Sequence, residues 1–284
     1  MLPAIVTFSD VNEKYALSSV PKLAANTAKS YRSDIKHLLE AFGTAPLDQI
    51  KPVHIRQFLD GHSDKKTTAN RCKRLFSTMW NQARGWGYTD LPNPCEGIKG
   101  HKLKKRTYYI TDATFLAVRA QAAAPLRDAL DLAYLTGQRP GDAVDMTVRD
   151  IIDGHLVIDQ NKTGKPLRIA VVGELKDLLD RIQERKNGYK ILTDALLVNS
   201  HGKRLTLPAL RYQFDQARKA ARAELPDAAK EIAQFRFGEL RAKAADDTSD
   251  LRGEQAASDL LGHDNVRTTQ RHYLRRGKRV DPTK

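Results

Sequence analysis

Residues 260–273 read LLGHDNVRTTQRHY, and they place Tyr273 close to the end of a chain of 284 residues. His263 lies ten positions upstream, and a series of cationic side chains begins at Arg271 and continues beyond the tyrosine. A helix cap made by glycine and histidine, followed by a partly buried aromatic ring, would account for this stretch on structural grounds alone. The other interpretation is chemical, because a phenol among cations is a candidate nucleophile toward a phosphodiester.

The composition favours a polyanionic partner. The chain carries 48 Lys and Arg against 34 Asp and Glu, which gives a formal net charge of +14. Nucleic acid is the usual partner of so basic a protein, and solubility alone is the alternative explanation. The excess is spread out, with 17 cations against 9 acids in residues 1–105 and 31 against 25 in the remainder. Both parts are therefore candidates to contact phosphate.

Several other classes of protein are excluded by what the sequence lacks. The two cysteines, Cys72 and Cys95, provide neither a disulfide framework nor a metal cluster, as is typical of a reducing cytoplasm. There is no apolar run of the ~18 residues that a membrane span requires, and no signal peptide at the N-terminus. There is also no P-loop and no carboxylate cluster for Mg²⁺. The cysteine usage leads us to expect a cytoplasmic protein.

The chain divides into a helical part and a larger mixed part. After an N-terminal segment, 1–24, apolar residues at helical spacing predict a helical domain over 25–92. A basic stretch interrupted by proline and glycine, 93–106, is predicted to be an interdomain linker along a polyanion. Residues 107–284 predict helices and one β-hairpin near 160–165. The expected fold is mainly α with a small antiparallel β-sheet.

Cations of the third helix and of the linker are the candidate DNA contacts. They are Arg71, Lys73, Arg74, Lys102, Lys104 and Lys105. A solvated helix face is the alternative for the first three, but the basic composition favours a face toward phosphate.

Four further motifs precede Tyr273 along the chain. They are TGQRPGD at 136–142, KTG at 162–164, GELR at 238–241 and LLGH at 260–263. A plain turn, a solvated hairpin lysine, a core-edge arginine and a capping histidine would each explain one motif by itself. Their order is the informative feature.

This ordered set of motifs resembles the tyrosine recombinases, which are also called the phage integrase family. The resemblance spans nearly all of 107–284, and 25–88 is similar in placement and character to the core-binding domain of the family. It implies an N-terminal helical core-binding domain and a C-terminal catalytic domain that form a C-shaped clamp around double-stranded DNA. The function it implies is site-specific recombination by a phage or prophage integrase, which places the protein at the nucleoid.

The resemblance also implies a role for each conspicuous side chain. Tyr273 would attack a DNA phosphate, form a 3′-phosphotyrosine and release a 5′-hydroxyl. Arg139 and Arg241 would clamp the non-bridging oxygens, because a planar guanidinium donates paired hydrogen bonds and keeps its charge. Lys162 would be the general acid for the leaving 5′-oxygen, and His263 would donate to a phosphate oxygen. No metal or nucleotide would be needed.

One departure from the family pattern affects proton transfer. The family usually has a histidine, sometimes a lysine, three residues before the second arginine, and Gly238 occupies that position here. A general acid–base group contributes about 10²–10⁴-fold in rate, so its loss predicts a slow enzyme or a substitute. Arg236 and His272 are the candidate substitutes.

A second departure concerns the spacing before the tyrosine. The family commonly has nine residues from the histidine to the tyrosine, whereas Tyr273 follows His263 by ten and His272 falls at the usual position. One extra helical residue rotates a side chain by about 100°. We therefore expect a loop adjustment between Asp264 and Thr268.

The resemblance further implies an assembly. We expect a homotetramer in the synaptic complex, a monomer or weak oligomer when free, a role for DNA-bending accessory proteins, and no membrane. Asp142 is expected to buttress the turn that holds Arg139, and the tail 274–284 is a candidate to pack against a neighbouring subunit. Because only about 25 residues precede the first predicted helix, we expect either that an N-terminal arm-binding domain is absent or that this chain is a truncated form of a longer protein. Two alternatives stay open: a non-catalytic DNA-binding protein on a recombinase scaffold, and a helical RNA-binding protein.

Overall fold

The computed structural model describes residues 5–160, 166–191, 193–277, 280 and 282–283. The chain forms two compact units, Met1–Lys105 and Arg106–Lys284, each with its own apolar core. Among the described residues, no helix combines the length and the apolar character that crossing a membrane requires.

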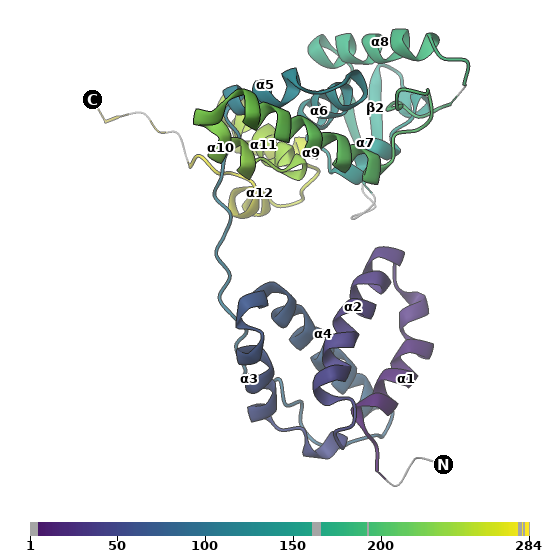
Figure 1. Ribbon diagram of the computed structural model, residues 1–284, viewed down its shortest axis with the longest axis vertical. Coiled ribbons are helices and arrows are strands. Elements are labelled where there is room, and N and C mark those ends of the chain that lie inside the picture. The colour runs from purple at the N-terminus through teal and green to yellow at the C-terminus, as the bar shows by residue number, and fades with distance from the viewer. Residues whose placement is uncertain (1–4, 161–165, 192, 278–279, 281, 284) are drawn as a thin grey trace. The chain divides into compact units, whose positions relative to one another are not determined.

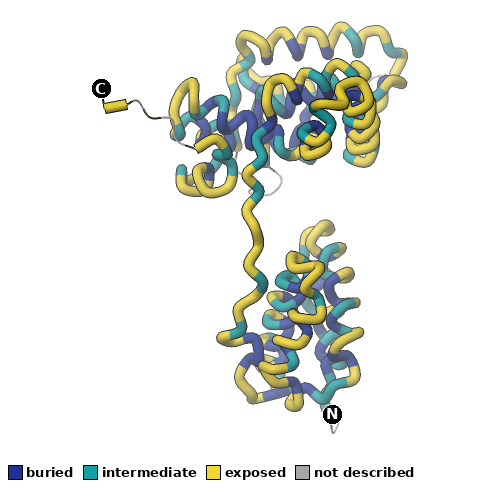
Figure 2. Tube along the Cα trace, turned by 60° about the vertical axis from the view of Figure 1, so that its left-hand side comes forward, coloured by how far each residue is buried: buried dark blue, intermediate teal, exposed yellow. Residues whose placement is uncertain are grey.

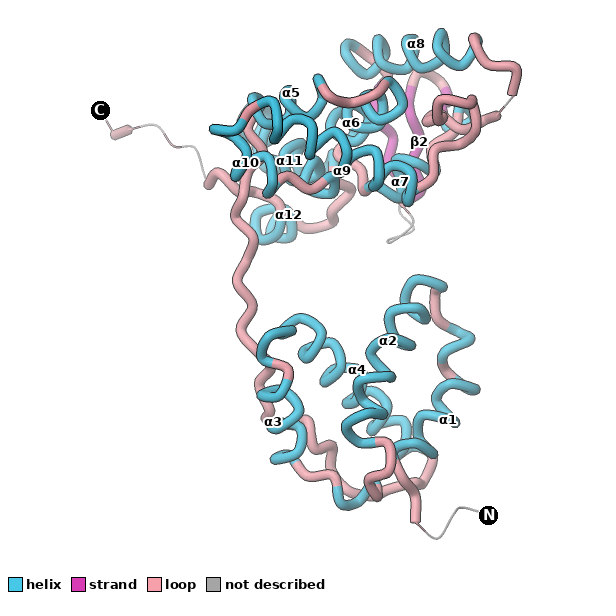
Figure 3. The backbone as a smooth tube through the Cα atoms, viewed as in Figure 1, coloured by secondary structure: helices cyan, strands magenta, loops and turns pink. Residues whose placement is uncertain are grey.

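The first unit is helical (Figures 1 and 3). Its elements are α1 (Phe8–Ser18), η1 (Val20–Lys22), α2 (Ala25–Phe42), η2 (Leu47–Gln49), α3 (Pro52–Gly61), η3 (Ser63–Lys65) and α4 (Lys66–Gly85), where η marks a short 3-10 helix. Aromatic rings join these helices, because Phe76 of α4 stacks on Phe8 at a centroid distance of 4.9 Å and lies 5.1 Å from Phe42. Trp80, one helical turn further along α4, extends the same cluster.

Helix α1 corrects the expected N-terminal segment 1–24, which was placed before the first helix. Thr7 and Asp10 form a capping box, with the Thr7 amide donating to the Asp10 carboxylate at 2.7 Å. Phe8, Val11 and Tyr15 are buried at helical spacing and join the core of the unit. Only three apolar side chains face inward, so the periodic signal in the sequence is weak although the helix is an integral part of the core.

The predicted linker, 93–106, is only partly an extended connection. Asn93 and Cys95 are buried, and the Asn93 amide donates to the Ser77 hydroxyl at 2.8 Å and to the Asn81 side chain at 2.9 Å. This part of the stretch therefore packs on α4 in the first unit. Residues 102–105 are exposed, as Figure 2 shows in yellow, and belong to no helix or strand.

The second unit combines helices with one small sheet. Its elements are α5 (Asp112–Ala120), α6 (Ala124–Thr136), α7 (Pro140–Asp145), η4 (Val148–Asp150), β1 (Ile151–Ile152), β2 (His155–Asp159), β3 (Pro166–Ala170), α8 (Gly173–Asn187), α9 (Leu207–Glu224), η5 (Pro226–Ala228), α10 (Ala229–Gln234), η6 (Phe237–Glu239), α11 (Leu240–Leu260) and α12 (Val266–His272). The sheet has the order β1-β2-β3 and is antiparallel throughout, with Leu156 opposite Ile169. The expected fold class, mainly α with a small antiparallel sheet, is confirmed.

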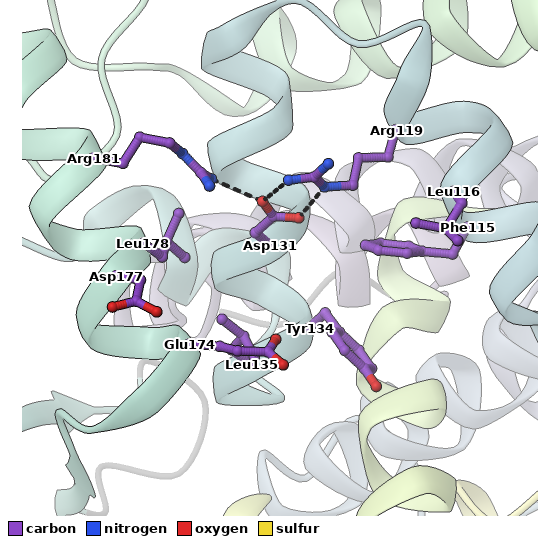
Figure 4. Close-up of a pocket in the computed structure, with 10 residues that line it drawn as sticks. All are labelled: Phe115, Leu116, Arg119, Asp131, Tyr134, Leu135, Glu174, Asp177, Leu178 and Arg181. Atoms are coloured by element: carbon purple, nitrogen blue, oxygen red, sulfur yellow. Dashed lines mark hydrogen bonds and ion pairs between the residues drawn. The ribbon is translucent and has the colours of Figure 1, made fainter.

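Helix α6 lies against α8, α9 and α11 and so forms the centre of the second unit. Its outer side carries Asp131, which accepts hydrogen bonds from Arg119 of α5 at 2.7 and 2.8 Å and from Arg181 of α8 at 2.8 Å (Figure 4). These ion pairs line a hollow of about 310 Å³ between α5, α6 and α8. Two guanidinium groups already share the Asp131 carboxylate. The charged side chains around the hollow therefore hold α5, α6 and α8 together.

Helix α11 is the element that positions most of the site. Its backbone leaves the helical conformation at Gly253, with φ 89°. The part before this break is deeply buried and carries Arg241 on the side toward α6 and α12. Side chains of its first turns can therefore hold segments that are distant in the sequence.

Candidate active site

Arg139 is placed by the turn between α6 and α7. Gly137 ends α6 in the left-handed conformation with φ 64°, and a Cβ there would lie 3.1 Å from the Leu261 side chain. The turn therefore requires glycine, both for its backbone angle and for its close packing. Arg139 follows as the residue that caps α7, and its Nη1 lies 3.5 Å from Asp142 Oδ2. Its side chain is 24% exposed, and this long contact leaves the guanidinium available for a ligand.

Arg241 is held much more tightly. It is 2% exposed, and it donates from Nη1 to the Gly137 carbonyl and from Nη2 to the Leu261 carbonyl, each at 2.7 Å. These two bonds join α11 to the turn that carries Arg139 and to the end of α11 itself. Its Nε is a buried donor without a hydrogen-bond partner among the described residues. Burial lowers the pKa of Arg241, the phenol of Tyr273 opposes this, and the neighbouring Arg139 lowers it further.

His263 lies between Arg241 and α12. Its Nδ1 is 2.8 Å from the Thr269 hydroxyl, and its Nε2 is 3.3 Å from Arg241 Nη2. Because a guanidinium only donates, Nε2 accepts, and the proton of the neutral ring is on Nδ1, which donates to Thr269. Burial, followed by the charges of Arg241 and Arg139, lowers the pKa of His263 to about 4. The expected donation to a phosphate oxygen therefore requires a proton to arrive on Nε2.

Tyr273 reaches this cluster although the spacing is ten residues. It follows the last residue of α12 with φ −119°, and its amide still donates to the Thr269 carbonyl at 2.8 Å. Its ring lies 5.0 Å from the His263 ring, and the guanidinium carbon of Arg241 is 5.3 Å from its centroid. His272, at the position usual for the family, is exposed. The structure thus brings Tyr273 against the histidine and the arginine.

Lys162 lies outside the described residues, but the strand end before it does not. Gln160 follows β2 and is 1% exposed, and its amide donates to Gln138 Oε1 at 2.8 Å and to the Leu261 carbonyl at 3.0 Å. Gln138 Oε1 is in turn 3.5 Å from Arg241 Nη1. These two glutamines connect the end of β2 to the buried arginine. Sequence reasoning missed their role, and the only local signal was the place of Gln138 beside Arg139 in TGQRPGD.

Gly238 stands in open space. A Cβ at this position would meet only Pro140 Cγ, at 4.0 Å. Beside it is a hollow of about 630 Å³, whose lining includes Arg211, Phe214 and Arg236. A histidine would therefore fit here without displacing the backbone. Arg236 is exposed.

The predicted DNA contacts in the first unit differ in their surroundings. Arg71 donates to Asp34 at 2.5 and 3.0 Å, and Asp34 is 1% exposed, so this guanidinium compensates a buried carboxylate between α2 and α4. Lys73 is half-buried. The remaining candidates are exposed: Arg74, Lys102, Lys104 and Lys105.

The potential metal ligands that the structure describes do not form a cluster. Among the described residues, no group of three or more histidine, cysteine, aspartate or glutamate side chains is arranged to hold a metal ion. Both cysteines are buried, and burial raises the pKa of Cys72 to about 12 and that of Cys95 to about 11. Their thiols are therefore unreactive at neutral pH.

The chain has a helical unit and a mixed unit, and the mixed unit carries two arginines, a histidine and a tyrosine near the C-terminus. This is the arrangement of a site-specific DNA recombinase of the tyrosine class. Comparison with known proteins agrees. The profile of the phage integrase family matches residues 110–279, and the profile of the phage integrase N-terminal SAM-like domain matches residues 7–62. The chain belongs to the phage integrase family.

The chain is also similar to individual proteins of known sequence and structure. An integrase of Enterobacteria phage 434 is 28% identical over 267 residues, which cover 90% of this chain and 72% of the relative. A crystal structure of a lambda integrase dimer bound to a COC′ core site aligns with a TM-score of 0.82 at 25% identity, over 99% of this chain and 81% of that one. A lambda integrase tetramer bound to a Holliday junction also aligns at 0.82, with 24% identity over 99% and 81% of the two chains.

Proposed function

We propose that this recombinase cleaves and rejoins DNA through a covalent phosphotyrosine at Tyr273, with Arg139, Arg241, Lys162 and His263 as its other catalytic groups. The observation that carries the proposal is the contact of Tyr273 with both His263 and Arg241. These three residues come from α11, from the turn after it and from the end of α12. Family membership alone does not require Tyr273 in this place, because the spacing differs from the common one.

In the cleavage step, the Tyr273 oxygen attacks a backbone phosphorus and forms a P–O bond while the bond to the 5′-oxygen breaks. Arg139 and Arg241 bind the non-bridging oxygens, and their hydrogen bonds strengthen as negative charge builds on the phosphorane. Lys162 delivers a proton to the departing 5′-oxygen. The second strand's 5′-hydroxyl then reverses the same step, so that no external energy source is consumed.

The unpartnered Nε of Arg241 supports the role of this residue. A buried donor without an acceptor destabilises a folded protein by about 1–3 kcal/mol, and a phosphate oxygen would remove that cost. The other two donor nitrogens are already fixed on carbonyls, so the guanidinium is held in place before DNA arrives. Such preorganisation is what lets a fixed charge favour the transition state.

His263 changes its role when phosphate binds. The cations that lower its pKa are the same arginines that the phosphate neutralises. A bound dianionic phosphorane therefore favours protonation of Nε2, which then donates to a phosphate oxygen while Nδ1 stays on Thr269. When Tyr273 attacks, its phenol proton either moves to Nε2 of His263 or leaves to solvent.

The partner is double-stranded DNA, and the active assembly is a synaptic homotetramer that forms from a monomer or weak oligomer. DNA-bending proteins are the proposed accessory factors, and the nucleoid in the cytoplasm is the proposed location. The proposed contacts to the DNA backbone are Lys73, Arg74 and the exposed lysines of residues 102–105. Arg71 contributes less to DNA binding than its position suggested, because Asp34 already holds its guanidinium.

One observation favours a second function, that of a DNA-binding protein with impaired cleavage. Gly238 lacks a proton-accepting side chain, and the two candidate substitutes, Arg236 and His272, are both exposed. The two functions differ in whether a covalent adduct forms.

The test uses a nicked suicide duplex that carries the core site, identified as the direct repeat that borders the gene. Wild-type protein is expected to form a covalent adduct that Tyr273→Phe abolishes. Tyr212→Phe is the matched control, because Tyr212 is 66% exposed on α9 and should leave adduct formation unchanged. Salt-sensitive binding of the wild type without any adduct would establish the second function instead.

A further inference from the structure

The chain segment directly after Tyr273 is anchored to α11. Leu274 continues from α12, with its amide on the Thr269 carbonyl at 3.1 Å. The next two amides donate to one carboxylate: Arg275 N to Asp246 Oδ1 and Oδ2 at 2.9 and 3.0 Å, and Arg276 N to Oδ1 at 3.3 Å. The backbone on the C-terminal side of the tyrosine is therefore fixed within three residues of it.

Asp246 is costly to bury, which argues that this contact has a purpose. It is 3% exposed, and its hydrogen-bond partners among the described residues are these two peptide groups. Burying a carboxylate without a directly bonded cation is unfavourable. Burial accordingly raises the pKa of Asp246, while the amides of Arg275 and Arg276 oppose the shift. An apolar residue would suit this helix position better if packing were its only task.

The side chains of the same segment add a second set of contacts. Arg276 lies 2.8 Å from Asp247 and 2.6 Å from Asp250, and its guanidinium carbon is 4.3 Å from the Tyr109 ring centroid. Arg275 reaches Glu239 at 3.3 Å.

Asp247 is itself held by a buried network. Lys243, which is 1% exposed, donates to it at 2.9 Å, and the hydroxyls of Tyr109 and Tyr134 donate at 2.6 and 2.9 Å. Asp247 is thus held in place by groups outside the terminal segment, and it is fixed where Arg276 meets it.

The arrangement connects the nucleophile to the arginine that binds the phosphate. Asp246 and Arg241 lie five residues apart on the buried part of α11. One helix therefore carries the Arg241 guanidinium and anchors the backbone that follows Tyr273. This connection matters here because Tyr273 lies beyond the last turn of α12, where a helix no longer defines the direction of its side chain.

We propose that Asp246 is a positioning residue for Tyr273, which holds the backbone of Arg275 and Arg276 so that the phenol at the end of α12 faces Arg241. The proposal rests on the proposed function of Tyr273 as the nucleophile. It also gives a physical account of how the chain tolerates ten residues after His263.

The experiment compares wild type, Asp246→Ala, Asp246→Asn and Asp250→Ala in the full chain. Asp250→Ala is the matched control, because it removes an ion pair of Arg276 without removing an acceptor of a backbone amide. Amide exchange of residues 274–277 is followed by mass spectrometry, and single-turnover adduct formation is measured at saturating nicked duplex. In Asp246→Ala, exchange should accelerate at least about 10-fold because the anchored amides open locally.

The rate constant of adduct formation in Asp246→Ala should fall about 10–100-fold, as expected when a reacting group is displaced by about 1 Å. DNA affinity and the Asp250→Ala rate should stay within about 3-fold of wild type. A purely structural role would instead lower the amplitude of adduct formation and leave the rate constant of the folded fraction unchanged. Asp246→Asn keeps the shape and one acceptor oxygen, so its exchange rate and its rate constant of adduct formation should lie between those of wild type and Asp246→Ala. If the alanine variant does not fold, the asparagine variant provides the test.

Unchanged exchange of residues 274–277 in the Asp246 variants would overturn the anchor. Faster exchange with an unchanged rate constant would overturn the positioning role. A wild-type protein that forms no adduct would refute the proposed nucleophile, and the exchange data would still show whether Asp246 holds the segment. The two failures are therefore distinguishable.

Discussion

The two candidate phosphate-binding arginines should respond differently to removal. Arg241→Ala and Arg139→Ala delete the same guanidinium group from residues proposed to contact the same phosphate. Arg241 also supports the fold through the carbonyls of Gly137 and Leu261, whereas Arg139 makes a long contact with Asp142. We therefore expect both variants to lose cleavage and only Arg241→Ala to lose stability.

The size of the effect follows from the geometry. Each of the two 2.7 Å bonds of Arg241 runs from a charged donor to a carbonyl in a buried turn, and each stabilises by about 1.5 kcal/mol. Removing the buried Nε donor that has no acceptor among the described residues returns about 1 kcal/mol. The net loss is about 2 kcal/mol, which lowers the Tm by about 4–8 °C for a domain of 150–250 residues. Arg139→Ala should stay within about 2 °C of wild type.

The assay combines thermal unfolding with single-turnover cleavage of the nicked duplex. Cleavage should fall about 10²–10³-fold in each variant, as for loss of one donor to a transition-state oxyanion. Arg241→Lys is a useful third variant. It keeps the charge, but it cannot donate to both carbonyls, so its Tm should lie between those of wild type and Arg241→Ala.

Equal Tm losses in the two alanine variants would refute the structural asymmetry. Cleavage by Arg241→Ala at the wild-type rate would refute the phosphate contact. The first result would mean that the bonds from Arg241 to the two carbonyls add little to the stability of the turn, and the second that the phosphate is bound by other groups.

Three further predictions concern the proton transfers. Gly238→His should speed cleavage by about 10-fold or more, because the space beside Gly238 admits an imidazole, and an unchanged single-turnover rate would show that another group already serves. His263 has a folded-state pKa of about 4 against an ordinary 6.5, so its contribution to stability is complete above pH 6.5 and is lost as the pH falls toward 4. The loss should reach about 1–2 kcal/mol at pH 5 in chemical denaturation, and a His263→Gln variant that keeps the full pH dependence would contradict this. Lys162→Ala should slow cleavage about 10²–10⁴-fold and recover on a duplex whose 5′-bridging oxygen is sulfur, since a thiolate leaves without a proton. Lys165→Ala is its matched control, and absence of recovery would assign the acid to another residue.

The N-terminal helix shows why local pattern was insufficient for part of the fold. Phe8, Val11 and Tyr15 are too few to give a strong periodic signal, and they gain their significance from packing on α4 and α2. The helices and the hairpin of the second unit have longer apolar patterns, and the sequence predicted a mainly helical unit with one hairpin, as the structure has it.

The sequence by itself determined the fold class, the family and the order of the chemical groups from Arg139 to Tyr273. These properties depend on short motifs, in which a glycine turn, a planar cation or a phenol has the same chemistry wherever it lies. Only the tertiary structure decided that Tyr273 and not His272 faces His263, because that choice depends on how the end of α12 meets α11.

Only the tertiary structure, likewise, gave Arg241 its carbonyl acceptors and Asp246 its place beneath the segment after the nucleophile. Such contacts join residues separated by 20 to 104 positions. Burial and hydrogen-bond partners at that distance arise from packing, and no local pattern of residues records them.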